Sequence, residues 1–394
     1  RITFPYIFLI SLVALFMGIL NSFRHFAAPA AAPILLNAGI IAAVVGLSPH
    51  CSRPVIGLAV GVIIGGALQV MLQIPWLMKA GVSLRPRWGP GHPGVRRIGR
   101  LMLPAVFGSA VYQFNQFVGT LLASFLPEGS VSWLYYADRL VQFPLGVFAI
   151  AISTAALPSL SRQAAESGLH AFRETLEYAM RLVLFITLPA MTGLMVLGPL
   201  IIRVLFERGA FAAASTAMTT QALVFYCVGL WAFSGIRVLV AGFYALQDTK
   251  TPVKAAFIAL IANVAFSLAL MGPLRHGGLA LALSLASTVQ FAALALFLGK
   301  QVPGWNVRSI ARTAGISVCA SGIMGGGIAL LYRAWWNPGA QTGLLELILG
   351  LCGLVALGAV IYFGVSRLLG SRELSTMMAL FLQKTQRGNG IGGS

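Results

Sequence analysis

Acidic residues are rare in this sequence. Only 9 of its 394 residues are Asp or Glu, against 27 Lys and Arg, and charged residues make up 9% of the chain. A soluble domain carries about 25% charged residues. This shortage, together with 58% hydrophobic residues, excludes a water-soluble globular protein. Nucleic-acid-binding domains are also basic but are not this apolar, so we expect no nucleic-acid partner.

Residues that support catalysis or metal binding are scarce too. The four cysteines, at positions 51, 227, 319 and 352, are far apart, which excludes a disulfide framework and a zinc-binding spacing. There is no glycine-rich phosphate loop, no catalytic triad and no metal-binding cluster. Glu174 and Glu177 lie one helical turn apart, but arginines flank them and favour a solvated helix end. We therefore expect neither an enzyme nor a metal or cofactor.

Long apolar runs dominate what is present. A helix needs roughly 20 apolar residues to cross about 30 Å of hydrocarbon, and these runs lack the alternation of β-barrel strands. The sequence therefore predicts an all-α, polytopic membrane protein. We expect about eleven transmembrane helices, at 4–23, 32–48, 55–78, 98–126, 131–158, 176–199, 218–246, 253–271, 278–299, 309–332 and 343–368.

The polar stretch between 79 and 100 is the longest interruption and is rich in proline and glycine, so we interpret it as a link between two lobes. The sequence around Pro29 resembles that around Pro252 in layout, which indicates a parallel repeat of about six helices per lobe. The expected organisation is a three-helix remainder of an N-terminal lobe (1–80), a cytoplasmic interlobe link (81–97), a six-helix C-terminal lobe (98–300), two extra helices (301–370) and a cytoplasmic tail (371–394).

Positive charges predict the orientation. Of the Lys and Arg residues, 19 fall in every second connection and 6 in the others, while Arg139 and Arg237 lie within spans. Because loops rich in Lys and Arg stay in the cytoplasm, the C-terminus and the link are predicted inside and residue 1 outside. No signal peptide is visible, so we expect an odd number of further spans before residue 1.

Two arginines are predicted deep in the membrane. Arg139 lies about eight residues into its span, where a charge costs at least a few kcal/mol unless it faces protein or a water-filled cavity. Its neighbour Asp138 points about 100° away on a helix, so the pair cannot close on itself. Arg237 is equally deep, and snorkelling to the span end would be a long reach. The alternatives are a cavity-lining cation and a purely structural ion pair.

Two guanidinium groups against one carboxylate would leave a cavity positive and favour an anion. Arginine binds phosphate oxygens in a bidentate fork, although a carboxylate or chloride would also fit. Other polar residues lie within spans, and interhelical hydrogen bonds explain most such residues; lining the cavity is the alternative for them. They are Gln113, Asn115, Gln116, Asn263 and Ser267. The candidate binding residues are Arg139, Arg237, Asp138 and Asn115. We assign the spacings Gly61-x-x-x-Gly65 and Gly322-x-x-x-Gly326 to helix packing.

Three segments carry a family resemblance. They are RITFPYIFLISLVALFMGILNSFRHFAAPAAAPILLN (1–37), GSVSWLYYADRLVQFPLGVFAIAISTAALPSLSR (129–162) and AGFYALQDTKTPVK (241–254). The chain resembles the MurJ/MviN lipid II flippases of bacterial cell-wall synthesis, within the multidrug/oligosaccharidyl-lipid/polysaccharide exporter superfamily. The resemblance implies spans four to fourteen of a fourteen-helix, two-lobe fold, with Arg139 as an essential cavity arginine and Arg237 at an often basic position.

The resemblance further implies that the chain flips lipid II across the bacterial cytoplasmic (inner) membrane by alternating access. Lipid II is an undecaprenyl pyrophosphate that carries a saccharide-peptide headgroup, and its pyrophosphate would pair with cavity arginines. Its lipid tail would follow a groove at the last two spans, and membrane lipids are the other expected partners. Three alternatives remain open: an exporter of another polyprenyl-linked saccharide or a drug, a membrane scaffold without transport, and a polyprenyl-phosphate enzyme.

Overall fold

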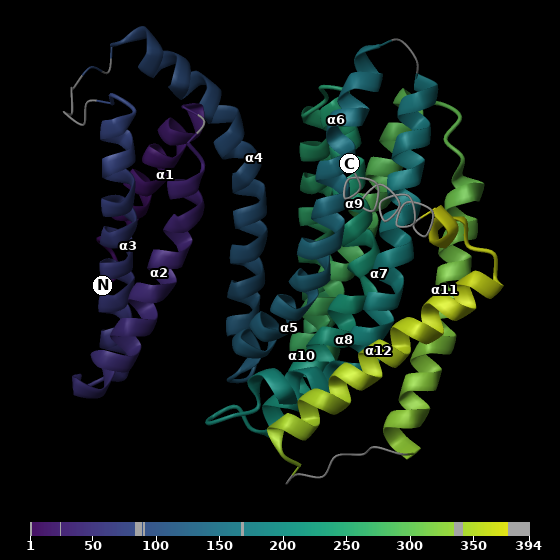
Figure 1. Cartoon of the computed structure of the whole chain (residues 1–394). Coiled ribbons are helices and arrows are strands. Elements are labelled where there is room, and N and C mark those ends of the chain that lie inside the picture. The colour runs from purple at the N-terminus through teal and green to yellow at the C-terminus, as the bar shows by residue number, and fades with distance from the viewer. Residues whose placement is uncertain are drawn as a thin grey trace, which may run out of the picture. The chain divides into compact units, whose positions relative to one another are not determined.

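The computed structural model of the chain describes residues 2–23, 25–82, 89, 91–166, 169–334 and 342–376. Side chains are described for the same residues except 100, 101, 103–109, 111 and 112. This part of the chain is helical and contains no strand, as the sequence predicts (Figure 1). Two compact units divide the chain, at 1–99 and 100–394. Parts of the predicted link (83–88 and 90) and tail (377–394) lie outside the described residues.

Unit 1 contains α1 (Tyr6–Ser22), α2 (Ala27–Gly46), a short 3-10 turn η1 (Ser48–His50), α3 (Pro54–Lys79) and the start of α4 (Pro93–Ser124). Glycines let α2 and α3 approach at backbone distance. A Cβ atom added to Gly39 would lie 2.8 Å from the Cα atom of Gly65, and one added to Gly61 would lie 3.1 Å from the Cα atom of Ile40. The packing role predicted for Gly61 and Gly65 is confirmed.

In the described part of unit 2, nine further helices or helical segments follow the rest of α4. They are α5 (Ser130–Pro144), a π-helical turn η2 (Leu145–Ile150), α6 (Ala151–Ala165), α7 (Leu169–Phe206), α8 (Ala213–Val228), α9 (Leu230–Ala245), α10 (Lys250–Gln301), α11 (Val307–Ala334) and α12 (Leu344–Leu368). Figure 1 shows α12 crossing unit 2 obliquely. Three large aromatic side chains, Phe172, Phe185 and Phe243, are completely buried in this unit.

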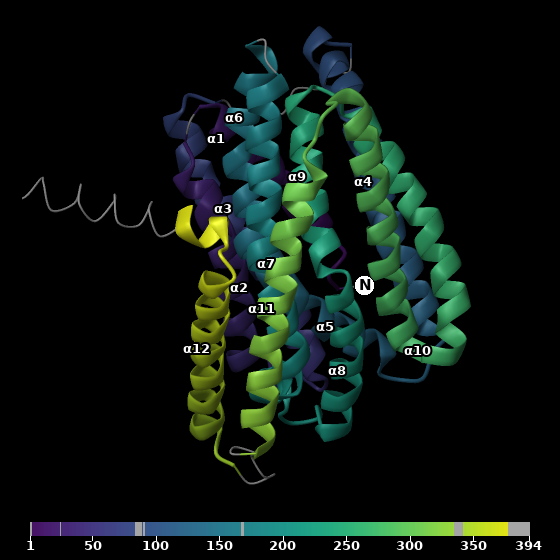
Figure 2. The same cartoon turned by 90° about the vertical axis from the view of Figure 1, so that its right-hand side faces the viewer.

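Seven of the described helical segments are long and apolar enough to cross a membrane, and the bent pair of α8 and α9 makes an eighth. The predicted spans 253–271 and 278–299 both fall in α10, whose arms fold back on each other around Arg275, a residue with φ +50° (Figure 2). The 17-residue α1 is apolar but shorter than the length expected of a span. Eleven spans therefore remain a prediction.

Large apolar side chains cover the outside of the helices. On α12, Leu345, Leu349 and Val360 are 63–70% exposed. Such a surface is costly in water, but in hydrocarbon it carries no penalty because the lipid tails are equally apolar. The exposed apolar faces therefore fit a protein surrounded by lipid.

The second predicted glycine contact is wrong. A Cβ atom added to Gly322 or Gly326 would meet nothing within 4 Å, whereas one added to Gly325 would lie 2.6 Å from the Cγ2 atom of Thr192 on α7. Consecutive helix positions point about 100° apart, so the packed face of α11 runs through Gly325 instead of its neighbours. The spacing of small residues alone could not identify that face.

Glu174 and Glu177 have different environments. Glu174 is exposed beside His170, with 3.7 Å between Oε2 and Nδ1, as a solvated helix end predicts. Glu177 is buried, and its Oε1 atom accepts a hydrogen bond of 2.7 Å from the backbone N–H of Asn306, which precedes α11. The prediction of a solvated position is therefore wrong for Glu177, because a loop 129 residues further along the chain covers it.

Asp248 closes the turn between α9 and α10. Its Oδ1 atom accepts hydrogen bonds of 3.0 Å from the backbone N–H groups of Lys250 and Thr251. Its Oδ2 atom accepts from the Thr251 hydroxyl at 2.6 Å and from the Gln301 side chain at 2.9 Å. The bonds from Thr251 are the main reason why the pKa of the Asp248 carboxyl is lowered to about 2. One carboxylate thus joins the start of α10 to its end.

Gly65→Ala should destabilise the chain, because the added Cβ would lie 2.9 Å from backbone atoms of Leu36, which cannot rotate away. Overpacking of this kind costs roughly 1–3 kcal/mol. We expect a lower melting temperature of the detergent-purified protein. Gly18→Ala on α1 is the matched control, since its Cβ would meet nothing within 4 Å. Equal melting temperatures for the two variants would contradict this account of α2 and α3.

Asp248→Ala should lower the melting temperature near neutral pH. The folded carboxyl ionises near pH 2, whereas an unfolded one titrates near 3.9. Its stabilising contribution is therefore complete above about pH 4 and is lost as the pH falls through about 2. Melting curves of both proteins across this range should show their difference shrinking toward acid pH. A difference that stays constant with pH would show that the charge of Asp248 contributes nothing.

Candidate functional site

A cavity of about 400 Å³ lies inside unit 2, between α4, α5, α8, α9 and α10. Apolar side chains form much of its wall, including Leu145, Phe233 and Leu260. Among them stand polar groups from all five helices: Asn115, Gln116, Asp138, Gln142, Tyr226, Arg237, Tyr244, Ser287 and Gln290. Several of these side chains are exposed, so the cavity is reached from outside the unit. An apolar pocket with a few convergent polar groups is the usual form of a ligand site.

Helix α5 presents a polar face to this cavity. Asp138 and Gln142 are one turn apart, and the Gln142 amide donates a 3.4 Å hydrogen bond to the Asp138 carboxylate. Pro144 follows, and it lacks the N–H that an α-helix would use at this position. The chain then continues through the π-helical turn η2, an irregularity found often at functional sites. Leu145, the first residue of that turn, lines the cavity.

Arg139 points elsewhere. Its side chain is exposed and does not line the cavity. Its guanidinium carbon lies 4.7 Å from the centroid of the Tyr135 ring, one turn earlier on α5, which is a cation–π contact. No ion pair joins Arg139 to Asp138 within the described part of the chain. The structure therefore brings Asp138 into the cavity and leaves Arg139 on the surface of unit 2.

Arg237 lines the cavity from α9. Among the residues described, it makes no hydrogen bond or ion pair, and its side chain is exposed to the cavity. An unpaired guanidinium beside apolar walls is available to an incoming anion. Of the two arginines that the sequence predicts to be deep, Arg237 alone lines this cavity.

A break between α8 and α9 sets the position of Arg237. The two helices meet at Gly229 with a bend of 44°. A Cβ atom at Gly229 would lie 2.7 Å from the Cα atom of Ser284, so only glycine fits there. The Ser284 hydroxyl lies 2.7 and 3.2 Å from the carbonyl oxygens of Phe225 and Tyr226. It thereby satisfies backbone acceptors that a broken helix would leave exposed.

Asn115 both forms a hydrogen bond between helices and lines the cavity. Its Oδ1 atom accepts a 2.8 Å hydrogen bond from the Asn263 amide, which joins α4 to α10 and confirms the predicted interhelical bonding. Asn115 also lines the cavity, with Gln116 beside it. Of the other predicted polar residues, Gln113, Asn263 and Ser267 do not line it.

Several lining residues were missed from the sequence: Gln142, Tyr226, Tyr244, Ser287 and Gln290. Gln142 could have been found, because it lies four residues after Asp138 and so shares its helix face. Gln290 interrupts an apolar span, which is also a detectable signal. Tyrosine and serine carry no such signal, since both occur throughout helix interfaces in membranes.

The cavity is less positive than predicted. With Arg139 outside, the ionisable Arg and Asp side chains among the described lining residues are Arg237 and Asp138, one of each sign. Among these residues the expected excess of positive charge is therefore not found. Balanced charges with several amides and hydroxyls suit a ligand that combines an anionic group with many hydrogen-bonding groups.

Comparison with known proteins identifies the family of this chain. Residues 1–350 match the family model described as lipid II flippase MurJ. The chain belongs to this family. It is 40% identical over 382 residues to a probable lipid II flippase MurJ of Vibrio cholerae, covering 94% of this chain and 71% of the relative. It is 35% identical to the lipid II flippase MurJ of Burkholderia cenocepacia, over 94% of this chain and 72% of that one.

A solved structure agrees. The lipid II flippase MurJ in an inward closed conformation superposes with a TM-score of 0.75 at 27% identity, covering 93% of this chain and 73% of that one. The family resemblance drawn from the sequence is therefore confirmed, as are the all-helical membrane fold and a multi-pass membrane location. Members of this family are transporters of a lipid and not enzymes.

A cysteine introduced at Gln290 should react rapidly with a charged, membrane-impermeant thiol reagent if the cavity holds water. Thiols react as thiolates, which need a polar environment. Ile261→Cys is the matched control, since Ile261 lies on the other arm of α10 with its side chain 58% exposed on the apolar surface. The native cysteines are first replaced by alanine, and labelling is followed by mass spectrometry. Faster labelling at position 261 than at 290 would contradict a hydrated cavity.

Proposed function

We propose that this chain flips lipid II from the cytoplasmic to the periplasmic leaflet of the bacterial inner membrane, and that the cavity in unit 2 binds part of the headgroup. Membership of the family supports lipid II as the transported molecule. The observation that carries the cavity assignment is the guanidinium of Arg237, which has no partner among the described residues and lies among apolar walls and amide side chains. Alternating access, in which the cavity opens to one leaflet and then to the other, is the mechanism that we infer.

Arg237 is the proposed partner of the pyrophosphate. A bidentate guanidinium fork matches the geometry of two phosphate oxygens. In a cavity with apolar walls, the attraction is less screened than in water. Asp138 lines the same cavity and would repel a second anion, so it limits how far the pyrophosphate enters. The phosphate groups are therefore expected on the Arg237 side of the cavity.

The amide and hydroxyl groups are the proposed partners of the saccharide and peptide. Gln116, Gln142 and Gln290 each offer donors and acceptors to the cavity, and Asp138 accepts from sugar hydroxyl groups. Drug-sized ligands occupy pockets of roughly 300–1,000 Å³. A volume of about 400 Å³ therefore holds only a portion of a headgroup that combines two sugars with a peptide.

Arg139 is the proposed second contact. An exposed guanidinium cannot face acyl chains without a cost of at least a few kcal/mol. Tyr135 holds it at the surface of unit 2 by a cation–π contact, so its charge stays available. We infer that this surface borders a water-filled passage along which the headgroup moves. Arg139 would contact the pyrophosphate there, before or after the cavity does.

The orientation follows from the basic residues. The connections that hold most of the Lys and Arg are proposed to lie in the cytoplasm, together with the C-terminus. Lipid II would then enter from the basic side. The transmembrane potential acts on the moving pyrophosphate at about 2.3 kcal/mol per charge per 100 mV.

Arg237→Gln should weaken lipid II binding. A hydrogen bond to a charged group contributes about 1.5–3 kcal/mol, so we expect roughly a tenfold to hundredfold loss of affinity. Binding is measured with purified protein and lipid II. Rescue of cells depleted of their own flippase, at matched expression, gives the functional readout. Arg237→Lys keeps the positive charge but lacks the bidentate fork, so its affinity for lipid II should lie between those of the native chain and of Arg237→Gln.

Arg139 provides the second arm of the same experiment. Arg139→Ala should fail to rescue growth, and Arg139→Lys should rescue partly. Arg333→Gln is the control, because Arg333 is an exposed arginine that lines neither this cavity nor the smaller pocket of unit 2. Normal growth and binding with Arg237→Gln and Arg139→Ala together would contradict the proposed headgroup site.

A further inference from the structure

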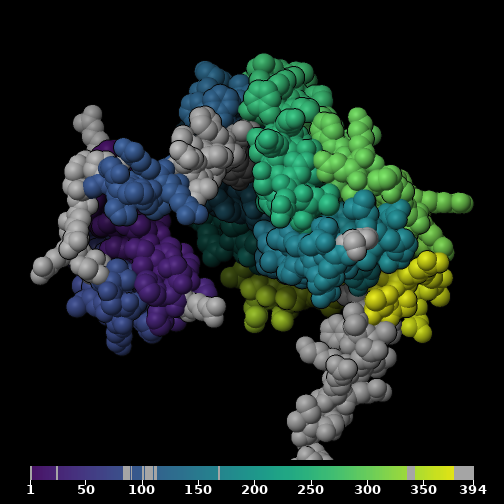
Figure 3. All heavy atoms as spheres, turned by 90° about the horizontal axis from the view of Figure 1, so that it is seen from above, coloured from purple at the N-terminus to yellow at the C-terminus, as the bar shows by residue number. Residues whose placement is uncertain are grey.

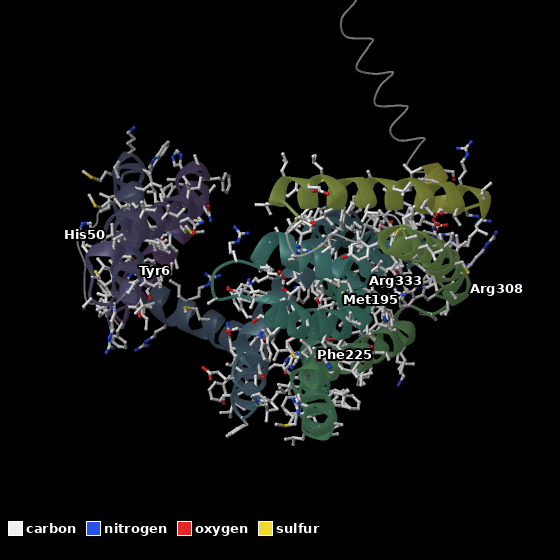
Figure 4. All side chains as sticks on the ribbon, turned by 90° about the horizontal axis from the view of Figure 1, so that it is seen from below. Tyr6, His50, Met195, Phe225, Arg308 and Arg333 are labelled. Carbon is white, nitrogen blue, oxygen red and sulfur yellow. The ribbon has the colours of Figure 1, made fainter. Side chains whose placement is uncertain are left out.

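A second, smaller hollow of about 210 Å³ lies in unit 2 beside the start of α11 and the segment after α12. In Figure 3 the start of α11 in light green and the residues after α12 in yellow adjoin. Three arginines line the hollow, Arg308 and Arg312 from α11 and Arg372 from the segment after α12. Figure 4 shows Arg308 at the edge of unit 2, away from Phe225 on α8, so this hollow is distinct from the cavity already described.

Glu373 forms the base of this arginine pocket. It is 4% exposed, and its Oε1 atom lies 3.2 Å from Nε of Arg181 on α7. The same carboxylate accepts hydrogen bonds from the hydroxyl groups of Thr313 at 2.9 Å and Ser371 at 3.2 Å. These contacts fasten the segment after α12 to α7 and α11. They also occupy the carboxylate, so its charge is already compensated inside the protein.

The three lining arginines have no such compensation. Arg308, Arg312 and Arg372 are exposed, and within the described residues none of them forms an ion pair. Arg308 and Arg312 are four residues apart on one helix face, where like charges repel. Both lie in the first two turns of α11, where the helix macrodipole also disfavours cations. An anion in the pocket would relieve all of these repulsions.

The surroundings indicate the kind of anion. Helix α11 begins at Val307 and α12 ends at Leu368, and both helices are long and apolar enough to span a membrane. The pocket therefore lies where the hydrocarbon region ends. Two exposed apolar residues lie close in sequence to residues that line it: Val307, which precedes Arg308, is 67% exposed, and Leu368, two residues before Gly370, is 87% exposed. A ligand with a phosphate and acyl chains could place the phosphate among the arginines and the chains along these residues.

We propose that the arginine pocket binds the phosphate headgroup of an anionic phospholipid from the surrounding leaflet. Basic pockets between membrane helices commonly bind lipid headgroups on the cytoplasmic side, which is where the basic residues of the sequence place this end. Guanidinium forks from two separate elements hold one phosphate. The bound lipid would join α11 to the segment after α12 and reinforce the contact made by Glu373. This proposal does not depend on the lipid II site.

The test uses the full chain reconstituted in phosphatidylcholine vesicles, with and without phosphatidylglycerol; these lipids contain no lipid II. The variant carries Arg308→Gln, Arg312→Gln and Arg372→Gln. Its matched control carries Lys250→Gln, Lys254→Gln and Lys300→Gln, which removes the same charge from exposed positions outside the pocket. Phosphatidylglycerol should raise the melting temperature of the native chain and of the lysine control, and should not raise that of the arginine variant.

Lipid retention gives a second readout that does not depend on stability. Native mass spectrometry should show phosphatidylglycerol retained by the native chain, with roughly a hundredfold loss of apparent affinity in the arginine variant. Arg308→Lys with Arg312→Lys should keep part of the binding, which separates lost contacts from misfolding. Equal losses in the lysine control would show general surface attraction and overturn the proposal. An equal melting-temperature rise with inorganic phosphate alone would show an anion site without a lipid.

Discussion

The cost of placing charge and unpaired backbone groups in hydrocarbon organises this protein. Exposed apolar side chains such as Leu349 face outward at no cost in lipid, and Arg237 and Asp138 line a cavity. Arg237 lies well inside a bent pair of helices that together are long and apolar enough to span the membrane. It is tolerable there because it faces a cavity with water-accessible polar groups. The same rule applies to the irregular segments beside this cavity, the turn η2 and the bend between α8 and α9.

The irregularities open the cavity without leaving the backbone unsatisfied. At Gly229 the chain bends by 44°, and the Ser284 hydroxyl contacts the carbonyl oxygens that the bend releases. On the other side, Pro144 removes a donor and the helix widens into a π-helical turn at Leu145. Both features lie beside residues that line the cavity. Helix breaks in membrane proteins are tolerated where they line a polar space, so the site and the fold have one physical cause.

The sequence predicts the class of fold and several residues of the cavity. It does not predict the direction in which a side chain points. Depth in a span identifies Arg237 and Asp138 because charge at that depth must be compensated. It cannot say which way a side chain points: Arg139 follows Asp138 directly, and a turn of about 100° carries it out of the cavity. The residues that flank Glu177 in the sequence predict a solvated position, but a loop 129 residues further along the chain covers it. Local patterns hold no information about such contacts.

The two arginine-containing sites differ in a way that fits the proposed functions. One arginine and one acid line the cavity, whereas three arginines that form no ion pair among the described residues line the pocket at the start of α11. A transported ligand must bind well enough to enter and weakly enough to leave. Several guanidinium forks around a pyrophosphate would hold it in the cavity, so a single arginine opposed by Asp138 is the better arrangement for release. A lipid that reinforces the fold has no need to leave, so tight binding by a cluster of arginines in that pocket would not slow transport. On these proposals, charge balance would distinguish a site for passage from a site for retention.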